Sequence, residues 1–162
     1  MTDTRTEISE RLFRDVLGHY CTGVAVITAM DGDEPVGFSC QSFQSVSLNP
    51  AMVSFAPALT STTWPRIRRA GMFAANILSA DQAELCRTFA VSGADKFADV
   101  RWRPGRIGAP LLDGALATVE CEIADEVKAG DHMIVLGQVR HLEARGGSPL
   151  LFYRGRFERL AS

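Results

Sequence analysis

The chain has 162 residues, and its 17 lysines and arginines against 19 aspartates and glutamates give a formal net charge of −2. This length suits one domain, and a charge so close to neutral argues against a nucleic-acid-binding surface. No apolar stretch approaches the roughly 20 residues of a membrane span, the first ten residues lack a signal-peptide pattern, and the four cysteines form no C-x-x-C pair. We therefore expect a single cytoplasmic domain over residues 1–162, with reduced thiols, no bound metal and no membrane or nucleic-acid partner.

The first half of the chain predicts a helix, a hairpin, a buried strand and a second helix. Apolar residues recur at helical spacing over residues 8–17, which Gly18 ends. Residues 22–30 are rich in β-branched side chains, turn residues follow at 31–35, and residues 36–46 continue as an extended run, so a hairpin is expected. Residues 51–56 predict another strand. Hydroxyl residues before position 64, with Pro65 in the first turn, predict a short helix over 64–69.

The second half adds strands and one more helix. Residues 72–78 predict a strand, and Ser79 with Gln82 predicts a capping box that begins a helix. Residues 91–110 are irregular, aromatic and basic, which favours a loop that covers something and acts as a lid. Residues 118–123 alternate as a strand whose wet face includes Glu120, and 132–142 and 150–160 predict two more strands. Six or seven strands without βαβ alternation favour a mainly β fold with short helices, an antiparallel barrel.

Several common catalytic motifs are missing. The chain has neither a G-x-G-x-x-G fingerprint nor a G-x-x-x-x-G-K-[ST] phosphate loop, so any nucleotide must bind on another scaffold. Residues 37–41 approach the G-x-S-x-G nucleophile elbow, but Gln41 holds the last position and the run stays extended, which disfavours a serine hydrolase. The three histidines, His19, His132 and His141, lack metal-ligand spacing.

Two clusters of small polar residues are candidates for ligand binding. Residues 39–47 carry hydroxyls and amides on an extended run, which would leave backbone groups approachable by a flat polar ring. An edge strand with a solvated face explains the same residues. Residues 60–64 place hydroxyls and free backbone N–H groups at a helix start, a typical phosphate site, although an ordinary cap has the same composition.

Other residues are candidates for ligand binding only when they are considered together. Arg87 and Lys96 flank the irregular segment and would neutralise a phosphate, or they are simply solvated charges. His132 follows a turn and would lie near the barrel mouth, or it is an exposed hairpin histidine. Gly155 interrupts the last predicted strand, which permits a close approach by a ligand or marks a bulge.

The order of these segments resembles a known family. The matching segments are residues 13–28, 37–50, 61–64, 73–78 with Asn76, 95–97, 102–104, 130–132 and 151–155. Together they resemble the flavin reductase-like, FMN-binding split-barrel family over nearly the whole chain. Residues 37–43 look most like the reductase that is paired with an aromatic-ring hydroxylase of steroid catabolism.

The resemblance implies an antiparallel split barrel and a role for each matching residue. Phe38, Ser39, Cys40, Gln41, Ser42 and Ser45 would line the isoalloxazine of FMN or FAD, and Phe55, Ser61, Thr62, Thr63 and Trp64 would hold the ribityl phosphate. Asn76, Arg87, Lys96 and Phe97 would complete the flavin site, while His132, Tyr153, Arg154 and Gly155 would face the nicotinamide of NADH or NADPH. Gln41 and Gln44 stand where many members carry Ser or Thr, which bears on flavin preference.

The implied activity is hydride transfer from the nicotinamide to a flavin, with reduced flavin then diffusing to a separate monooxygenase. Since the two cofactors carry the electrons, the protein must mainly align two rings. A homodimer is expected, because such barrels use a second copy to cover sheet edges. Two alternatives stay open: a split barrel that binds flavin or senses redox state without turnover, and an oxidase of a phosphorylated pyridoxine-type substrate.

Overall fold

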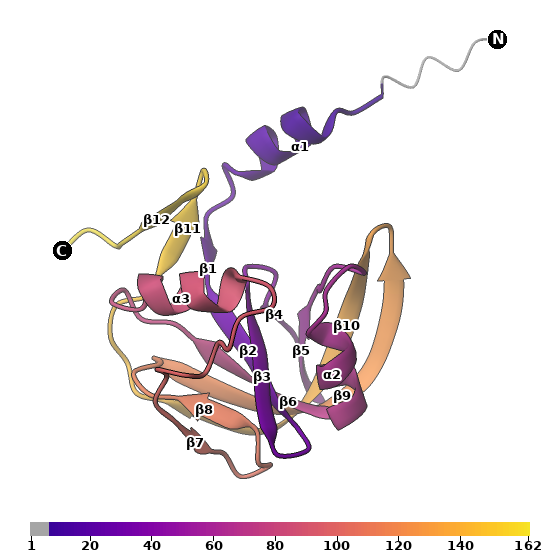
Figure 1. Cartoon of the computed structure of the whole chain (residues 1–162). Coiled ribbons are helices and arrows are strands. Elements are labelled where there is room, and N and C mark those ends of the chain that lie inside the picture. Colours follow the sequence, from indigo (N-terminus) through magenta and orange to yellow (C-terminus); the bar gives the residue numbers. More distant parts are fainter. Residues whose placement is uncertain (1–6) are drawn as a thin grey trace.

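The computed structural model describes residues 7–162, and a seven-stranded antiparallel sheet forms its body (Figure 1). The strands follow the order β3-β2-β6-β9-β10-β5-β4. Their bounds are β2 (Ala25–Asp31), β3 (Glu34–Cys40), β4 (Gln44–Leu48), β5 (Ala51–Phe55), β6 (Met72–Ile77), β9 (Ala117–Ala129) and β10 (His132–Ala144).

The sheet curls into a barrel that stays open along one seam. Strands β3 and β4 form its two edges, yet only residues 41–43 separate them in the chain. Four residue steps of extended chain reach at most about 14 Å, so the two edges must approach each other at this end. They do not pair with each other. The expectation of a mainly β, antiparallel split barrel is confirmed.

The remaining elements surround the barrel. Three helices are present in the described part of the chain: α1 (Glu10–Leu17), α2 (Trp64–Ala70) and α3 (Ala83–Ala90). Strands β1 (Thr22–Gly23), β11 (Leu151–Tyr153) and β12 (Arg156–Glu158) form a small sheet, and β7 (Trp102–Pro104) pairs with β8 (Pro110–Leu112). Helix α1 stands apart from the barrel (Figure 1), and no helix within residues 7–162 is long and apolar enough to cross a membrane.

Aromatic side chains fill the barrel interior. Phe55 is 1% exposed and packs edge-on against Phe73 and Trp64, with ring centroids 4.9 and 5.7 Å apart. Gly137 on β10 makes room for Phe73, since a Cβ at this position would lie 2.5 Å from the Phe73 ring. Such close packing makes the barrel a rigid frame for the residues at its rim.

Two predicted strands are interrupted in the structure. The run over residues 36–46 breaks at 41–43, because the chain must cross the seam there from β3 to β4. The run over 150–160 is a hairpin of β11 and β12, with Arg154 (φ 49°) and Gly155 (φ 77°) in its turn. Two consecutive residues with positive φ are typical of a tight hairpin turn, so Gly155 marks a turn and not a bulge.

Two local predictions were also wrong. Glu120 was expected on a wet face, but it is 2% exposed, with Oε1 accepting the Ile107 N–H at 3.0 Å, because the segment around β7 and β8 covers this face of β9. Ser79 does not begin helix α3. Its N–H donates to Gln82 Oε1 at 2.9 Å, which is one half of a capping box, and the helix begins at Ala83.

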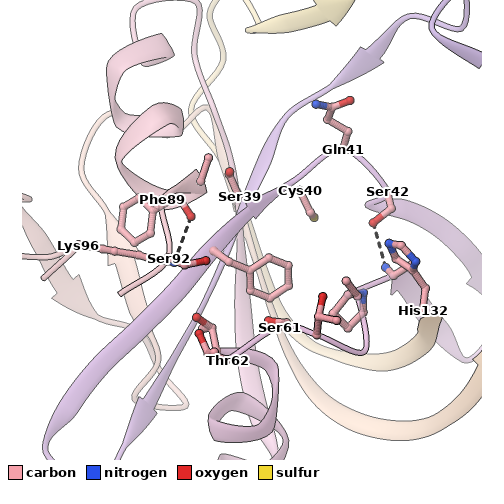
Figure 2. A pocket seen from close by; sticks show the side chains of 17 residues that line it. Ser39, Cys40, Gln41, Ser42, Ser61, Thr62, Phe89, Ser92, Lys96 and His132 are labelled. Carbon is pink, nitrogen blue, oxygen red and sulfur yellow. Dashed lines mark hydrogen bonds between the residues drawn. The ribbon is translucent and has the colours of Figure 1, made fainter. Parts of the chain in front are cut away.

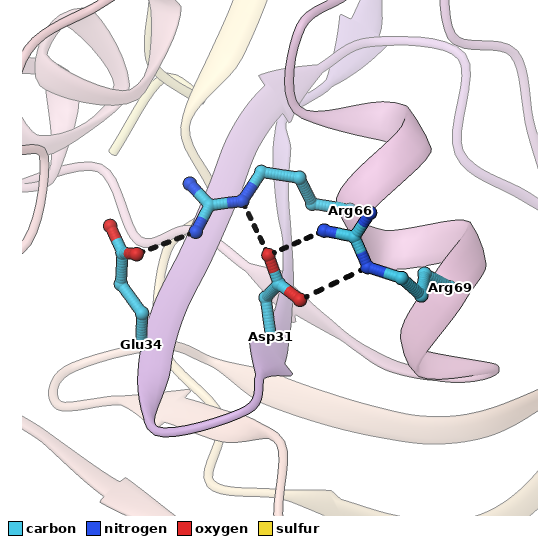
Figure 3. Close-up of polar contacts among 4 residues, drawn as sticks. All are labelled: Asp31, Glu34, Arg66 and Arg69. Carbon is cyan, nitrogen blue, oxygen red and sulfur yellow. Dashed lines mark hydrogen bonds and ion pairs between the residues drawn. The ribbon is translucent and has the colours of Figure 1, made fainter.

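An ion-pair cluster fastens α2 to the β2–β3 hairpin (Figure 3). Arg66 Nε donates to Asp31 Oδ2 and Arg66 Nη2 to Glu34 Oε2, both at 2.6 Å, and Arg69 Nη2 donates to Asp31 Oδ2 at 2.8 Å. Hydrogen bonds from Arg69 and then Arg66 lower the pKa of Asp31. The cluster therefore fixes the orientation of the helix that follows residues 60–63.

The lowered pKa of Asp31 predicts a pH-dependent contribution to stability. In the folded state Asp31 ionises at lower pH than in the unfolded chain, so its contribution is full above the unfolded pKa and is lost as pH falls through the folded one. We expect Asp31→Asn to lower Tm at neutral pH, and the difference from the unchanged protein to shrink as pH drops below about 4. Thermal melts across pH, with exposed Asp33→Asn as control, test this. A difference that is constant with pH would contradict it.

Candidate functional site

A pocket of about 520 Å³ opens at the end of the barrel where the chain crosses from β3 to β4. Four parts of the chain line it: residues 38–42, residues 56–58 with 60–63, the end of α3 with Ser92 and Lys96, and His132 at the start of β10. Figure 2 shows Lys96 and His132 at opposite ends, with Ser61 and Thr62 below and Gln41 above. We call this the inner pocket, and its volume is typical of small-molecule sites.

One side-chain and two backbone hydrogen bonds hold three of these walls together. Ser42 Oγ accepts the Ala56 N–H at 2.9 Å, which ties the crossover to the segment after β5. The Met133 N–H donates to Pro57 O and the Leu59 N–H to Asp131 O, both at 2.9 Å. These bonds fix residues 41–43, 56–59 and the start of β10 as one unit. These segments are distant in the sequence, and they meet only because the barrel closes.

The segment before α2 presents hydroxyl groups to the pocket. Ser61 Oγ accepts the Trp64 N–H at 3.1 Å, so its own O–H remains free to donate. Thr62 and Thr63 follow directly and also line the pocket, and Thr63 makes no capping bond with its side chain. Three adjacent hydroxyl donors on one wall suit an oxyanion such as a phosphate.

Lys96 is the one lysine or arginine of residues 7–162 that lines the inner pocket, and no carboxylate from these residues lines it. Its Nζ donates to Gly37 O at 3.0 Å and to Phe89 O at 3.2 Å, which leaves a third proton unassigned. Partial burial lowers the pKa of Lys96. The Lys96 end of the pocket therefore carries one fixed positive charge beside the hydroxyls of Thr62 and Thr63.

The opposite end is marked by a histidine. His132 Nδ1 lies 2.7 Å from Asp131 Oδ1, and this hydrogen bond lowers the pKa of Asp131. Because one ring nitrogen is engaged by Asp131, the other remains for a ligand. An imidazole held in this way can donate or accept one hydrogen bond at the edge of a bound ring.

Cys40 does not supply a reactive thiolate. Burial raises its pKa to about 11, so the thiol is protonated at neutral pH. The wall formed by residues 38–42 is consequently uncharged, and it can contact a flat, polar, electron-rich ring without an opposing charge.

Eleven of the predicted site residues lie in or beside this pocket. Ten line the inner pocket itself: Phe38, Ser39, Cys40, Gln41, Ser42, Ser61, Thr62, Thr63, Lys96 and His132. Phe97 lines an adjoining pocket that shares Thr62, Thr63 and Lys96.

Three predicted residues instead lie in the protein interior. Phe55 and Trp64 are 1% and 5% exposed, and both belong to the barrel core, although Phe55 also reaches a separate groove behind residues 41–44. Asn76 is fully buried: its Nδ2 donates to Val26 O and Thr28 Oγ1, each at 3.1 Å, and its Oδ1 accepts the Leu112 N–H at 2.9 Å. These bonds occupy the amide group and join β6 to β2 and β8, and Asn76 does not line the inner pocket.

The structure does not bring the other five predicted residues to the inner pocket. Ser45 is exposed on β4, at the edge of the sheet. Arg87 pairs with Glu84 on its own helix and lies over the Phe157 ring. Tyr153, Arg154 and Gly155 form the β11–β12 turn, which contacts the end of α1 through the Arg154 N–H and Gly18 O.

Several lining residues carried no recognisable signal in the sequence. They are Ala56, Pro57, Ala58, Phe89, Ala90 and Ser92. Small and apolar residues of this kind are common in any core. Some of them reach the pocket because residues 57–59 pair with residues 131–133. That pairing forms only when the barrel closes, so the sequence alone does not predict it.

The fold and the pocket define a class: a split-barrel protein whose rim pocket has an uncharged wall and one cationic, hydroxyl-rich end. Comparison with known proteins makes this specific. Residues 17–161 match the flavin reductase-like domain, and the chain belongs to the flavin reductase-like family.

Similar proteins carry related names. The chain is 44% identical over 151 residues to the reductase subunit HsaB of a flavin-dependent monooxygenase from Rhodococcus jostii, covering 93% of this chain and 77% of that one. It is 40% identical to the FMN reductase (NADH) SmoA of Agrobacterium fabrum, covering 94% and 87%. Its structure resembles nitrilotriacetate monooxygenase component B of Mycobacterium thermoresistibile with a TM-score of 0.91 and 43% identity, covering 93% and 86%.

Proposed function

We propose that this chain is an NAD(P)H-dependent flavin reductase that binds FMN or FAD in the inner pocket and supplies reduced flavin to a separate monooxygenase. The observation that carries the proposal is the polarity of the pocket along its length. Its cation and hydroxyls lie at the Lys96 end, its uncharged wall lies beside them, and its histidine lies at the far end. A flavin phosphate has one anionic end and one broad neutral ring, which matches this arrangement. The reductase names of two similar proteins support the same reading.

The residues present fit a flavin. Thr62, Thr63 and Lys96 would hold the phosphate, since hydroxyls and an ammonium are suitable donors for it. Residues 38–42 would lie along the ring, and the break in pairing at 41–43 leaves backbone donors there that are not committed to the sheet. Donors aimed at the ring edge would stabilise negative charge that develops on reduction.

When bound, the flavin and the nicotinamide supply the hydride chemistry between them. The chain has to bring the two rings together and exclude water, and no proton has to be taken by Cys40, whose thiol stays protonated. His132 would bind the nicotinamide carboxamide at its end of the pocket and orient it. The pocket therefore has three parts: an end that binds phosphate, a wall that contacts the ring, and an imidazole that orients the nicotinamide.

His132→Ala is expected to raise KM for the nicotinamide substrate more than it lowers kcat. The physical reason is that the imidazole contributes a hydrogen bond to binding and transfers no proton. Steady-state kinetics at saturating flavin measure both constants. His141→Ala, on the same strand but outside the pocket, is the control. A loss of turnover with unchanged affinity for the nicotinamide would contradict this role.

We also propose that the functional unit is a homodimer. Helix α1 has no buried residue, and Leu12, Phe13, Val16 and Leu17 are each at least 50% exposed. An amphipathic helix whose apolar side chains are left exposed by the rest of residues 7–162 suits burial against a second copy, which would also cover the exposed edge strand β4. Analytical ultracentrifugation of the protein and of Leu12→Glu tests this. A monomer in both cases would refute it.

Turnover distinguishes this function from that of a flavin-binding or redox-sensing protein. We would mix catalytic amounts of protein with excess FMN or FAD and with NADH or NADPH, and follow the absorbance of the reduced nicotinamide. The proposal predicts oxidation of many equivalents per protein in at least one combination. If flavin binds but only one equivalent or none is oxidised, the binding or sensing alternative holds.

The donation of reduced flavin needs its own test. The partner class we propose is an aromatic-ring hydroxylase of the steroid-catabolism type, because residues 37–43 resemble the reductase of such a system. An oxygenase of this class should hydroxylate its substrate when mixed with the chain, flavin and nicotinamide, and also when a dialysis membrane that passes flavin separates the two proteins. Activity that requires direct contact would contradict transfer by diffusion.

A further inference from the structure

A second pocket of about 610 Å³ adjoins the inner pocket, and the two share Thr62, Thr63 and Lys96. We call it the outer pocket. Its remaining walls are residues 34–37 at the start of β3, Arg66 on α2, and residues 93–97. Because the shared residues are the proposed phosphate-binding residues, a ligand group on the side of that phosphate away from the flavin ring can extend into the outer pocket.

The charges at the boundary suit a second phosphate. Lys96 lines both pockets, and within residues 7–162 its Nζ donates to two backbone carbonyls and to no carboxylate. Arg66 lines the outer pocket, and Asp31 and Glu34 fix its guanidinium through Nε and Nη2, while Nη1 makes no hydrogen bond within residues 7–162 (Figure 3). Lys96 and the Nη1 group of Arg66 line this pocket together with Thr62 and Thr63, and these donors would accommodate a pyrophosphate.

The walls beyond the boundary suit a nucleoside more than a free anion. Glu34 and Asp95 line this pocket, and their carboxylates can accept hydrogen bonds from sugar hydroxyls but would repel a further anion. Pro35, Val36 and Phe97 add apolar surface for a flat base. The combination of a cationic boundary, acidic walls and apolar surface matches a phosphate-linked nucleoside.

We propose that the outer pocket binds the adenylate half of FAD, which makes FAD the preferred flavin of this chain. The inference rests on the proposed function, since it takes the inner pocket as the flavin site. NADH and NADPH also carry an adenylate. We assign the pocket to the flavin because it continues from the Lys96 end, whereas His132 lies at the opposite end (Figure 2).

Isothermal titration of the full chain with oxidised FMN and FAD tests the inference without turnover. We expect FAD to bind at least about fivefold more tightly than FMN, because it uses both pockets. Ala94, which lines the outer pocket only and is exposed, offers a site to fill it. Ala94→Trp should weaken FAD binding by roughly tenfold or more, equivalent to about 1.4 kcal/mol, and leave FMN within twofold. Ala98→Trp, on the same exposed segment but outside both pockets, is the matched control.

The outcomes separate the two proposals. Equal or weaker binding of FAD in the unchanged protein overturns the inference, and this arm needs no variant. If a folded Ala94→Trp protein loses affinity for FMN and for FAD equally, the inference is overturned as well. If FMN binding is unaffected but KM for NADH with FMN rises instead, the outer pocket belongs to the nicotinamide cofactor and the assignment to FAD is wrong. Failure of the unchanged protein to bind either flavin would instead overturn the proposed function.

Discussion

Replacing Lys96 with methionine is expected to raise the Kd for FMN about 10–100-fold and to leave the Kd for riboflavin nearly unchanged. Methionine keeps the length of the side chain but removes the charge that lies beside Thr62 and Thr63. A hydrogen bond to a charged group contributes about 1.5–3 kcal/mol, which corresponds to this loss of affinity. Riboflavin lacks the phosphate, so it does not report on this contact. Titration of both ligands measures the effect.

Arg87→Met is the matched control, because Arg87 is paired with Glu84 and does not line the pocket. It should change neither Kd. Lys96 also donates to Gly37 O and Phe89 O, so its replacement removes two bonds that hold the segment of residues 91–97. An equal loss of FMN and riboflavin affinity would show that Lys96 acts by holding this segment and not by binding phosphate.

Phe55→Ala is expected to lower the free energy of unfolding by about 3–5 kcal/mol. The ring is 1% exposed and packs against Phe38, Phe73 and Trp64 in the barrel core. Its removal leaves a cavity that these rigid neighbours fill only in part. For a domain of this size, the change lowers Tm by on the order of 10 °C. Chemical and thermal unfolding of both proteins measure it.

Leu142→Ala provides the surface control, since Leu142 is 63% exposed on β10, and its Tm should stay within a few degrees of the unchanged protein. The resemblance to the flavin reductases placed Phe55 at the flavin. A Phe55→Ala protein that keeps its Tm but loses flavin affinity would favour that role and contradict the structural one.

Local patterns predicted the parts of the site that depend on neighbours in the chain. Ser61, Thr62 and Thr63 precede a proline-containing helix, and the structure places all three on the pocket wall. The polar run that includes Ser39 and Ser42 also reaches the pocket. In both cases the residues are consecutive in the chain. They therefore stay close together in space in any tertiary fold.

Predictions failed where distant segments decide the environment. Alternation placed Glu120 on a wet face, but the segment around β7 and β8 covers it and its Oε1 binds the Ile107 N–H. Asn76 shows the same dependence on distant segments: its role at the flavin stays a prediction, while its amide bonds Val26 and Thr28 on β2 and Leu112 on β8. The period of a strand tells which residues share a face and not what covers that face.

The break at residues 41–43 has the same origin. Nothing in the composition of residues 36–46 interrupts an extended run. The interruption follows from the order of the sheet, in which β3 and β4 are opposite edges. This crossover carries Gln41 and Ser42 into the pocket, so the most informative feature of the site depends on barrel closure.

A crystal structure with bound flavin tests the central claim most directly. The account predicts an isoalloxazine against residues 38–42 and the first phosphate within hydrogen-bond distance of Thr62, Thr63 and Lys96. A flavin bound elsewhere, or an inner pocket that stays filled by the protein's own side chains at saturating flavin, would contradict it.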